Sequence, residues 1–388
     1  MTRLLLLEPE PTPAWAPFAG VRPVAELRAG IWRIRERWEA AVAADAEAVL
    51  GDHAIGLGES AEAPVRPTGE VEGPAIIGAA WFAPSGTPVA LGDGRRLTHG
   101  SATVGWVVPA GERWTGPHDV GAAVPIDGVL LRGTYDLLTA LELLLAADCA
   151  DFLAADRAPV PEGSIVLGDP AGVVSLGAQV EPGVVFDVRQ GAVVLESGVE
   201  VRHGTRLEGP LWAGVGTKLL GGYIRASVIG PECRVRGEVG SSVFLGYANK
   251  SHDGYVGHSV VGHWVNLGAG TTTSNLKNTY GPVRLDVIGG RIETGRLNVG
   301  TLFGDHAKTA IGTMLSTGTV ISVGANVFGA GSPPKFVPPF AWGGGGSAMS
   351  EAGFLRVAER VLPRRSVPFT PERRDLLRRL YARAMLAA

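Results

Sequence analysis

Two short segments in the middle of the chain carry the side chains best suited to chemistry. Residues 249–257 contain His252, and residues 267–277 contain Asn275. An imidazole with an ordinary pKa near 6.5 accepts a proton at neutral pH, so His252 is a candidate general base. The Asn275 amide is a candidate donor to a developing oxyanion. The alternative is that His252 is an exposed turn residue and Asn275 a loop residue that any β-helix tolerates.

The neighbours of these two residues suit a polar substrate. Tyr255 lies three residues after His252 and is expected to orient it or to line a pocket. Lys250 and Lys277 are candidate contacts to a phosphate, and the glycines in 268–270 allow the backbone to approach a ligand closely. No metal-ligand spacing is present, and we expect no metal site. A structural role is predicted for the remaining central histidines, which are His258, His263 and His306.

A six-residue repeat must position these side chains. Pairs of inward residues recur at every sixth position, which is typical of hexapeptide-repeat parallel β-helices, in which three short strands make one coil. The first pairs are Val193/Leu195, Val199/Val201, Thr205/Leu207, Leu211/Ala213 and Thr217/Leu219. The same frame is predicted at Val261, Leu267 and Thr273 and at the pairs Thr309/Ile311, Leu315/Thr317 and Ile321/Val323.

The chain outside the repeats predicts an α/β domain before them and helices after them. The domains expected are an α/β domain at 1–157, a β-helix at 158–331, and a linker with a helical tail at 332–388. Strands are expected at 4–7, 75–77 and 103–108, and helices within 24–38, 137–145, 351–362 and 371–387. One face of the last helix is basic, as in a solvated surface or an intersubunit contact.

Composition narrows the class of protein. The 388 residues suffice for two domains with proper cores, and the net charge of −3 without a long basic run argues against nucleic acid or a membrane surface as partner. The two cysteines, Cys149 and Cys233, lie in apolar segments without a CxxC spacing, so we expect free thiols in a reducing cytoplasm. No segment resembles a signal peptide or a membrane span.

The central segments resemble a known family. Residues 249–254 (NKSHDG) and 264–271 (WVNLGAGT) are similar to the acetyltransferase half of the bacterial GlmU-like family, the bifunctional N-acetylglucosamine-1-phosphate uridyltransferase/glucosamine-1-phosphate acetyltransferase. Together with residues 22–28 (RPVAELR) and 335–343 (KFVPPFAWG), they resemble a shorter branch described as sugar nucleotidyltransferases. The resemblance implies a left-handed β-helix, acetyl-CoA as cosubstrate, a sugar phosphate or nucleotide sugar as acceptor, and a homotrimer.

The resemblance also implies roles for individual residues. His252 corresponds to the base that deprotonates the sugar amine, Tyr255 to a sugar-phosphate contact, and Asn275 to a residue that holds the amino sugar or the acyl group. The residues expected along the coenzyme A arm are Gly300, Thr301, Ala310, Thr313 and Ser316.

Two departures from the family bear on function. Gly240 and Ser241 stand where the full-length family has a lysine for the sugar phosphate. After the first strand, residues 8–13 (EPEPTP) replace the glycine-rich loop that cradles a nucleoside triphosphate. We therefore expect a degenerate nucleotidyltransferase-like domain and an N-acetyltransferase. The alternatives are a bifunctional enzyme, which would need Mg²⁺, and a non-catalytic trimeric scaffold that binds a sugar nucleotide.

Overall fold

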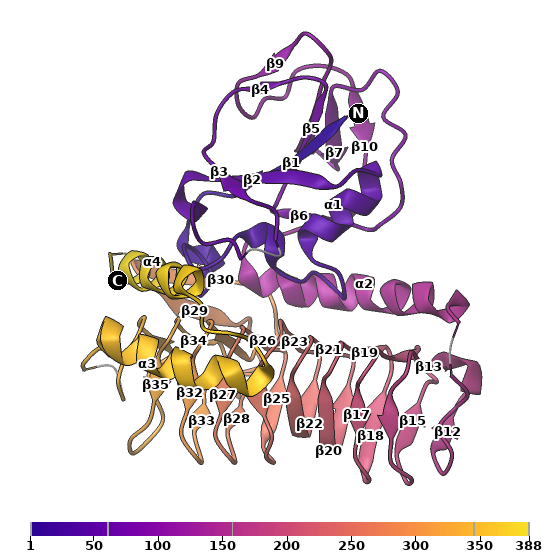
Figure 1. The fold of residues 1–388 in the computed structure, drawn as a ribbon, viewed down its shortest axis with the longest axis vertical. Helices are drawn as coiled ribbons and strands as arrows, with labels where there is room; N and C mark the ends of the chain where they lie inside the picture. Colours follow the sequence, from indigo (N-terminus) through magenta and orange to yellow (C-terminus); the bar gives the residue numbers. More distant parts are fainter. Residues whose placement is uncertain (1, 60–61, 157, 344–345, 387–388) are drawn as a thin grey trace.

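In the computed structural model, an α/β domain rests on one side of a long parallel β-solenoid, and two C-terminal helices lie near one end of it (Figure 1). The structure describes residues 2–59, 62–156, 158–343 and 346–386. The predicted fold class is therefore confirmed. Within the described residues, no helix has both the length and the apolar character needed to cross a membrane.

The α/β domain is built on a seven-stranded mixed sheet in which β8 alone runs antiparallel to the other strands. β1 pairs in parallel with β2 and β5, and β8 runs antiparallel between β5 and β7. In sheet order the strands are β10 (Ala123–Pro125), β7 (Arg96–His99), β8 (Ala102–Val108), β5 (Ala75–Ala79), β1 (Arg3–Leu7), β2 (Ala46–Leu50) and β3 (Val65–Arg66). The other elements are the pairs β4 (Val71–Glu72) with β9 (Arg113–Trp114) and β6 (Phe82–Pro84) with β11 (Gly128–Leu130), and helices α1 (Ile34–Val42) and α2 (Leu137–Asp151).

The strands and the helix α2 predicted for this domain are confirmed, but the helix predicted within 24–38 is wrong over its first two thirds. The α-helix begins only at Ile34, after a single 3-10 turn over Val24–Glu26. Gly30 has a φ of +71°, which interrupts any helix, and the Glu36 carboxylate caps the backbone N–H of Arg33. The apolar spacing that suggested a longer helix reflects burial of an irregular segment.

Each coil of the solenoid has three faces, named here A, B and C. Face A is a nine-stranded parallel sheet: β13 (Val173–Ser175), β16 (Val193–Leu195), β19 (Leu211–Ala213), β21 (Val228–Ile229), β23 (Val243–Phe244), β26 (Val260–Val261), β31 (Thr301–Phe303), β34 (Thr319–Ile321) and β36 (Phe336–Val337). Face B holds β14 (Gln179–Val180), β17 (Glu200–Val201), β24 (Asn249–Lys250), β27 (Asn266–Leu267), β32 (Lys308–Thr309) and β35 (Asn326–Val327). Face C holds β12 (Ile165–Leu167), β15 (Val185–Asp187), β18 (Thr205–Glu208), β25 (Tyr255–Gly257), β28 (Thr272–Thr273) and β33 (Met314–Leu315). Two long strands, β20 (Lys218–Arg225) and β22 (Arg234–Gly240), run from face B into face C.

The residues of the predicted rows are buried along the whole solenoid, with one exception in the last coils. The five pairs from Val193/Leu195 to Thr217/Leu219 are all buried. The pair Thr309/Ile311 is wrong, because Ile311 is 82% exposed. β32 ends at Thr309 and the chain turns at once through Gly312, whose φ is +72°, so the strand alternation does not reach Ile311. The other predicted positions are all buried: Val261, Leu267, Thr273, Leu315/Thr317 and Ile321/Val323.

Face A is apolar on both sides. Val193 and Leu195 point into the solenoid, whereas Val194 between them packs in the same hydrophobic cluster as α2 and the α/β domain. Trp212 and Val228 repeat this outward packing on the next coils. α2, with buried leucines along it, therefore lies along face A (Figure 1). One of the three faces is thus covered by the chain itself.

The two predicted C-terminal helices are confirmed as α3 (Glu351–Val361) and α4 (Pro371–Leu386). Part of the basic surface of α4 contacts the α/β domain within the same chain. The Arg379 Nε donates to the Gly56 carbonyl at 2.9 Å, and the Arg373 guanidinium lies 3.3 Å from the Glu59 carboxylate. Arg157, the last residue of the predicted α/β domain, and parts of the predicted linker and helical tail, at 344–345 and 387–388, lie outside the described residues.

Candidate active site

Three polar side chains meet at the corner where face C turns into face A. The Tyr255 hydroxyl donates to the Asn275 Oδ1 at 3.4 Å, and the Asn275 Nδ2 lies 2.8 Å from the His258 Nδ1. Tyr255 is on β25, His258 follows it, and Asn275 follows β28 one coil later. An amide nitrogen carries two N–H donors, so Asn275 keeps one for a ligand. The predicted pair Tyr255 and Asn275 is therefore brought together.

His258 is held neutral at this corner. Because Asn275 donates to the Nδ1, the ring proton of the neutral imidazole lies on the Nε2. Burial lowers the pKa of His258 from its ordinary value of 6.5, and the cations Arg296 and Arg225 lower it further, against the raising effect of Glu142. The uncharged ring can accept the hydrogen bond from the Asn275 amide and so hold that amide in place.

The corner is also where the solenoid releases its longest excursion. The chain leaves after Asn275 and returns at Val299, whose N–H donates to the Asn275 carbonyl at 3.0 Å. In between, β29 (Arg284–Val287) and β30 (Gly290–Glu293) form a hairpin. Arg296 then donates to the Thr139 hydroxyl at 2.6 Å and pairs with the Glu142 carboxylate at 2.5 Å. Both partners are on α2, so the end of the excursion is fixed to the α/β domain.

An arginine and two glycines form a row beside Tyr255. Arg225 aligns with Gly240 and then with Gly257 on successive coils of face C. A Cβ on Gly240 would lie 3.3 Å from the Arg225 Cζ, and one on Gly257 would lie 2.0 Å from the Tyr255 hydroxyl. The missing side chains leave room for both groups. No carboxylate in the described part of the chain is within ion-pair distance of Arg225, which makes it a cation available to a phosphate.

His252 lies at a different corner, where face B turns into face C. It is exposed, and no contact among the described residues joins its ring to Asn275. Lys250 supports the corner from inside, because its Nζ donates to the carbonyls of His252 at 2.9 Å and Arg236 at 2.7 Å. Burial lowers the pKa of Lys250 to about 8. A phosphate contact by Lys250 stays a prediction, and it would require the ammonium to leave these carbonyls.

The remaining predicted residues are divided between the two corners. Ala310 and Thr313 lie two coils beyond the His252 corner, where the Thr313 hydroxyl donates to the Ala310 carbonyl at 2.8 Å. Ser316 lies at the same corner as Asn275. Gly300 and Thr301 are there too but are buried in the wall of the coil, with Gly300 N–H bonded to the His258 carbonyl at 2.7 Å. The contacts of these residues with coenzyme A stay predictions.

Lys277, the last predicted substrate contact, lies in the excursion itself. Its Nζ donates to the Pro282 carbonyl at 2.8 Å, within the same loop. This bond is to a single carbonyl and the side chain is only half-buried, so the ammonium is more accessible than that of Lys250. Its contact with a phosphate also stays a prediction.

Sequence reasoning missed His258 and Arg225. The sequence predicts a structural role for His258 because it lies outside the two motifs, and Asn275 reaches it only through the stacking of the coils. Arg225 has a weak signal, since the residues that follow it in the same row, Gly240 and Gly257, are both glycines. An arginine followed in its row by two glycines indicates a recess at the surface. The three residues can be aligned only once the unequal lengths of the coils are known.

The end of β1, where a nucleotidyltransferase would hold phosphates, is occupied by the chain itself. The Glu8 carboxylate accepts the N–H groups of Val24 at 2.8 Å and Ala25 at 3.0 Å. Burial raises the pKa of Glu8 to about 7, against these two bonds. The two nearby cations face the solenoid: Arg22 contacts Asp305 at 2.8 Å, and the Arg28 guanidinium lies 5.1 Å from the Trp212 ring. Among the described residues, no cluster of His, Cys, Asp and Glu could hold a metal.

Parts of the chain are similar to known proteins. Residues 4–152 match the family model described as sugar nucleotidyl transferase. A bifunctional sugar-1-phosphate nucleotidylyltransferase/acetyltransferase of Sulfurisphaera tokodaii is 34% identical over 143 residues, covering 36% of each chain. The predicted resemblance to GlmU-like proteins is confirmed. The bifunctional protein GlmU of Methanocaldococcus jannaschii is 34% identical over 89 residues (23% of this chain and 21% of the relative), and that of Methanococcus vannielii 33% over 107 residues (27% and 25%).

The match to these GlmU-like relatives is partial. It spans about a third of the length of the Sulfurisphaera tokodaii protein and a quarter or less of the two GlmU proteins. The name of the first relative contains two transferase activities, which agrees with the predicted enzyme class. The family model ends at the C-terminus of α2, so it covers the α/β domain and leaves the solenoid outside.

Proposed function

We propose that the chain is an acetyl-CoA-dependent N-acyltransferase that acts on an amino-sugar phosphate or a nucleotide amino sugar. The observation that carries the proposal is the hydrogen-bonded group Tyr255–Asn275–His258 beside Arg225, a cation without a carboxylate partner in the described part of the chain. Such a corner offers an amide donor, a hydroxyl and a positive charge to one small polar substrate. The acetyltransferase named in the Sulfurisphaera tokodaii relative supports the same chemistry.

Each proposed residue has one role in the transfer. The sugar amine attacks the thioester carbonyl, the C–N bond forms and the C–S bond breaks, so the products are an amide and a free thiol. His252 accepts the proton that the amine loses. The free N–H of the Asn275 amide stabilises the oxyanion, and Arg225 with Tyr255 holds the phosphate. His252 and Asn275 lie at different corners of one chain, but both must contact the same reacting centre. A neighbouring subunit must therefore complete the site.

A homotrimer fits this requirement. Face A is covered by α2 and the α/β domain, so only faces B and C and their corners can contact another copy. At the His252 corner of the last coils, Ile311 and Met314 are 82% and 56% exposed. Exposed large apolar side chains at this corner are suited to an interface between subunits.

We also propose a cytoplasmic location. The free, buried thiols of Cys149 and Cys233 are consistent with it.

Nucleotidyl transfer is the second candidate, because the family model covers the α/β domain. The position of Glu8 opposes it, since a carboxylate already accepts the backbone N–H groups of Val24 and Ala25. We expect little or no pyrophosphate release from UTP or dTTP with a sugar-1-phosphate and Mg²⁺. Robust Mg²⁺-dependent release would establish the bifunctional alternative. A non-catalytic scaffold is the third candidate. It predicts release of neither coenzyme A thiol nor pyrophosphate.

The test of acyl transfer is the release of free coenzyme A thiol from acetyl-CoA by the purified protein. The acceptors are glucosamine-1-phosphate, its unphosphorylated sugar and a nucleotide amino sugar. We expect acceptor-dependent thiol release that requires the phosphate, and loss of that requirement in Arg225→Ala. Thiol release that no acceptor stimulates would contradict the proposal and favour the scaffold.

A further inference from the structure

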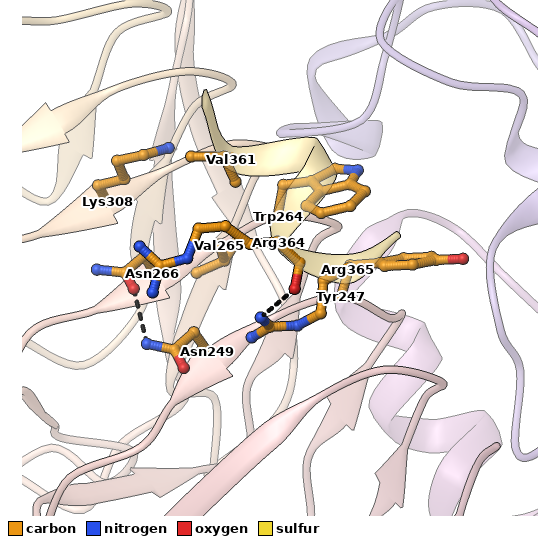
Figure 2. Close-up of a pocket in the computed structure, with 9 residues that line it drawn as sticks. All are labelled: Tyr247, Asn249, Trp264, Val265, Asn266, Lys308, Val361, Arg364 and Arg365. Atoms are coloured by element: carbon orange, nitrogen blue, oxygen red, sulfur yellow. Dashed lines mark hydrogen bonds between the residues drawn. The ribbon is translucent and has the colours of Figure 1, made fainter. Parts of the chain in front are cut away.

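A second polar pocket lies on the other side of the solenoid, at the corner between faces A and B. It has a volume of about 270 Å³ and lies between the C-terminal segment after α3 and the outer surface of face B. Figure 2 shows the nine residues that line it. They are Tyr247, Asn249, Trp264, Val265, Asn266, Lys308, Val361, Arg364 and Arg365. Three of them are cationic and none is acidic.

The floor of the pocket is a ladder of outward side chains on successive coils. Asn249 aligns with Asn266, and Asn266 aligns with Lys308. The Asn249 Nδ2 donates to the Asn266 Oδ1 at 2.7 Å, which leaves the Asn266 amide nitrogen directed away from its partner (Figure 2). The stacked rings of Tyr247 and Trp264, with centroids 4.5 Å apart, make one wall rigid. The floor is thus a fixed array of amide groups beside a cation.

Two of the three cations in the pocket, Lys308 and Arg365, donate to backbone carbonyls. The Lys308 Nζ donates to the His306 carbonyl at 2.9 Å, and an ammonium has three N–H donors. The Arg365 Nε donates to the Glu232 carbonyl at 3.2 Å, and its Nη1 to the Arg364 carbonyl at 3.3 Å. Burial lowers the pKa of Lys308 to about 8, and no charged neighbour contributes to that shift. Positive charge in a recess whose lining contains no acidic residue favours an anion.

We propose that this pocket binds a phosphate-bearing small molecule, with Lys308 and Arg364 as the charged contacts and Asn266 as an amide donor. The volume admits more than one phosphate group, so a diphosphate is the class that fits best. The inference is independent of acyl transfer, because it concerns the corner of faces A and B, whereas Asn275 and His258 lie at the corner of faces C and A. Binding here would fix the end of α3 against the solenoid.

Calorimetry with the full chain tests the proposal, using pyrophosphate, inorganic phosphate and ADP as probes. We expect saturable binding of pyrophosphate and weaker binding of phosphate. If ADP binds as tightly as pyrophosphate, the natural ligand is a nucleotide or another diphosphate ester. If only the free anion binds, it is pyrophosphate itself. Either result supports the pocket, whereas no saturable heat with any probe overturns it.

Matched variants separate this pocket from general surface charge. Arg364→Ala should weaken pyrophosphate binding about tenfold or more, since arginine–phosphate contacts are strong. Arg360→Ala, an exposed arginine of α3 outside the pocket, should leave the affinity unchanged. Lys308→Met should weaken binding similarly, and it should abolish any loss of affinity as the pH rises through about 8. Equal effects of Arg364→Ala and Arg360→Ala would overturn the proposal. Because Arg364 is exposed, its variant stays informative if Lys308→Met does not fold.

Discussion

Adding one methyl group at Gly257 should displace Tyr255 from the candidate site. The Cβ of an alanine there would lie 2.0 Å from the Tyr255 hydroxyl and 2.4 Å from its Cζ, whereas non-bonded atoms need about 3.5 Å. The hydroxyl must therefore move by about 1.5 Å, which breaks its bond to Asn275. The backbone of Gly257 has no left-handed φ, so alanine adds no strain of its own.

The size of the effect follows from what is lost. A hydrogen bond of this kind contributes about 0.5–1.5 kcal/mol, so we expect kcat/KM for acyl transfer to fall about 2- to 10-fold. Crowding of a half-buried ring that can swing outward should cost about 1 kcal/mol of unfolding free energy, the low end for an overpacked site. Steady-state thiol release and thermal unfolding measure the two quantities separately.

Two variants calibrate this experiment. Tyr255→Phe removes the hydroxyl without crowding, so it should reproduce the loss of activity without the loss of stability. Gly240→Ala, in the same row, brings a Cβ only to 3.3 Å from the Arg225 Cζ and should have a smaller effect, mainly on KM. Unchanged kinetics in both Gly257→Ala and Tyr255→Phe would refute the assignment of Tyr255 to the site.

Three other results are expected. Asn275→Ala should lower kcat about 10²–10³-fold if its amide stabilises the oxyanion, and near-normal turnover would leave it a structural corner residue. The buried Glu8 has a pKa of about 7 against 4.5 unfolded, so its stabilising contribution is complete below pH 4.5 and is lost as the pH rises through 7. Wild type should therefore lose more thermal stability between pH 5 and pH 8 than Glu8→Gln, and equal slopes would contradict this environment. Light scattering should show a trimer that Ile311→Arg dissociates, whereas an active monomer at micromolar concentration would exclude the assembly.

Periodicity predicted the solenoid well because each coil repeats the same burial. The inward pairs from Val193 to Leu219 required only the alternation of a strand and a six-residue period. Ile311 escaped that rule because its strand ends two residues earlier and the chain turns there. The helix predicted from Val24 was wrong for a related reason, since burial on the solenoid imposes an apolar spacing without helical geometry. In both places tertiary packing decided the local structure.

The candidate site was only half predictable. Tyr255 and Asn275 were identified from their motifs, and the structure joins them. His258 and Arg225 enter only through stacking of coils whose lengths vary: Val193 aligns with Leu211, but Val228 aligns with Val243. A strict period of eighteen would misplace every row beyond that point. The burial of the Lys250 ammonium is likewise a property of the corner and not of its sequence.

The identity of the general base is the central claim, and two histidine variants test it most directly. His252→Ala should lower kcat for thiol release about 10²–10⁴-fold with folding intact, because the side chain is exposed and contributes little to the core. His258→Ala should have a smaller effect, about tenfold, since that ring only fixes the Asn275 amide. Near-normal turnover by His252→Ala, or a larger loss in His258→Ala, would contradict the account and assign the proton transfer to His258.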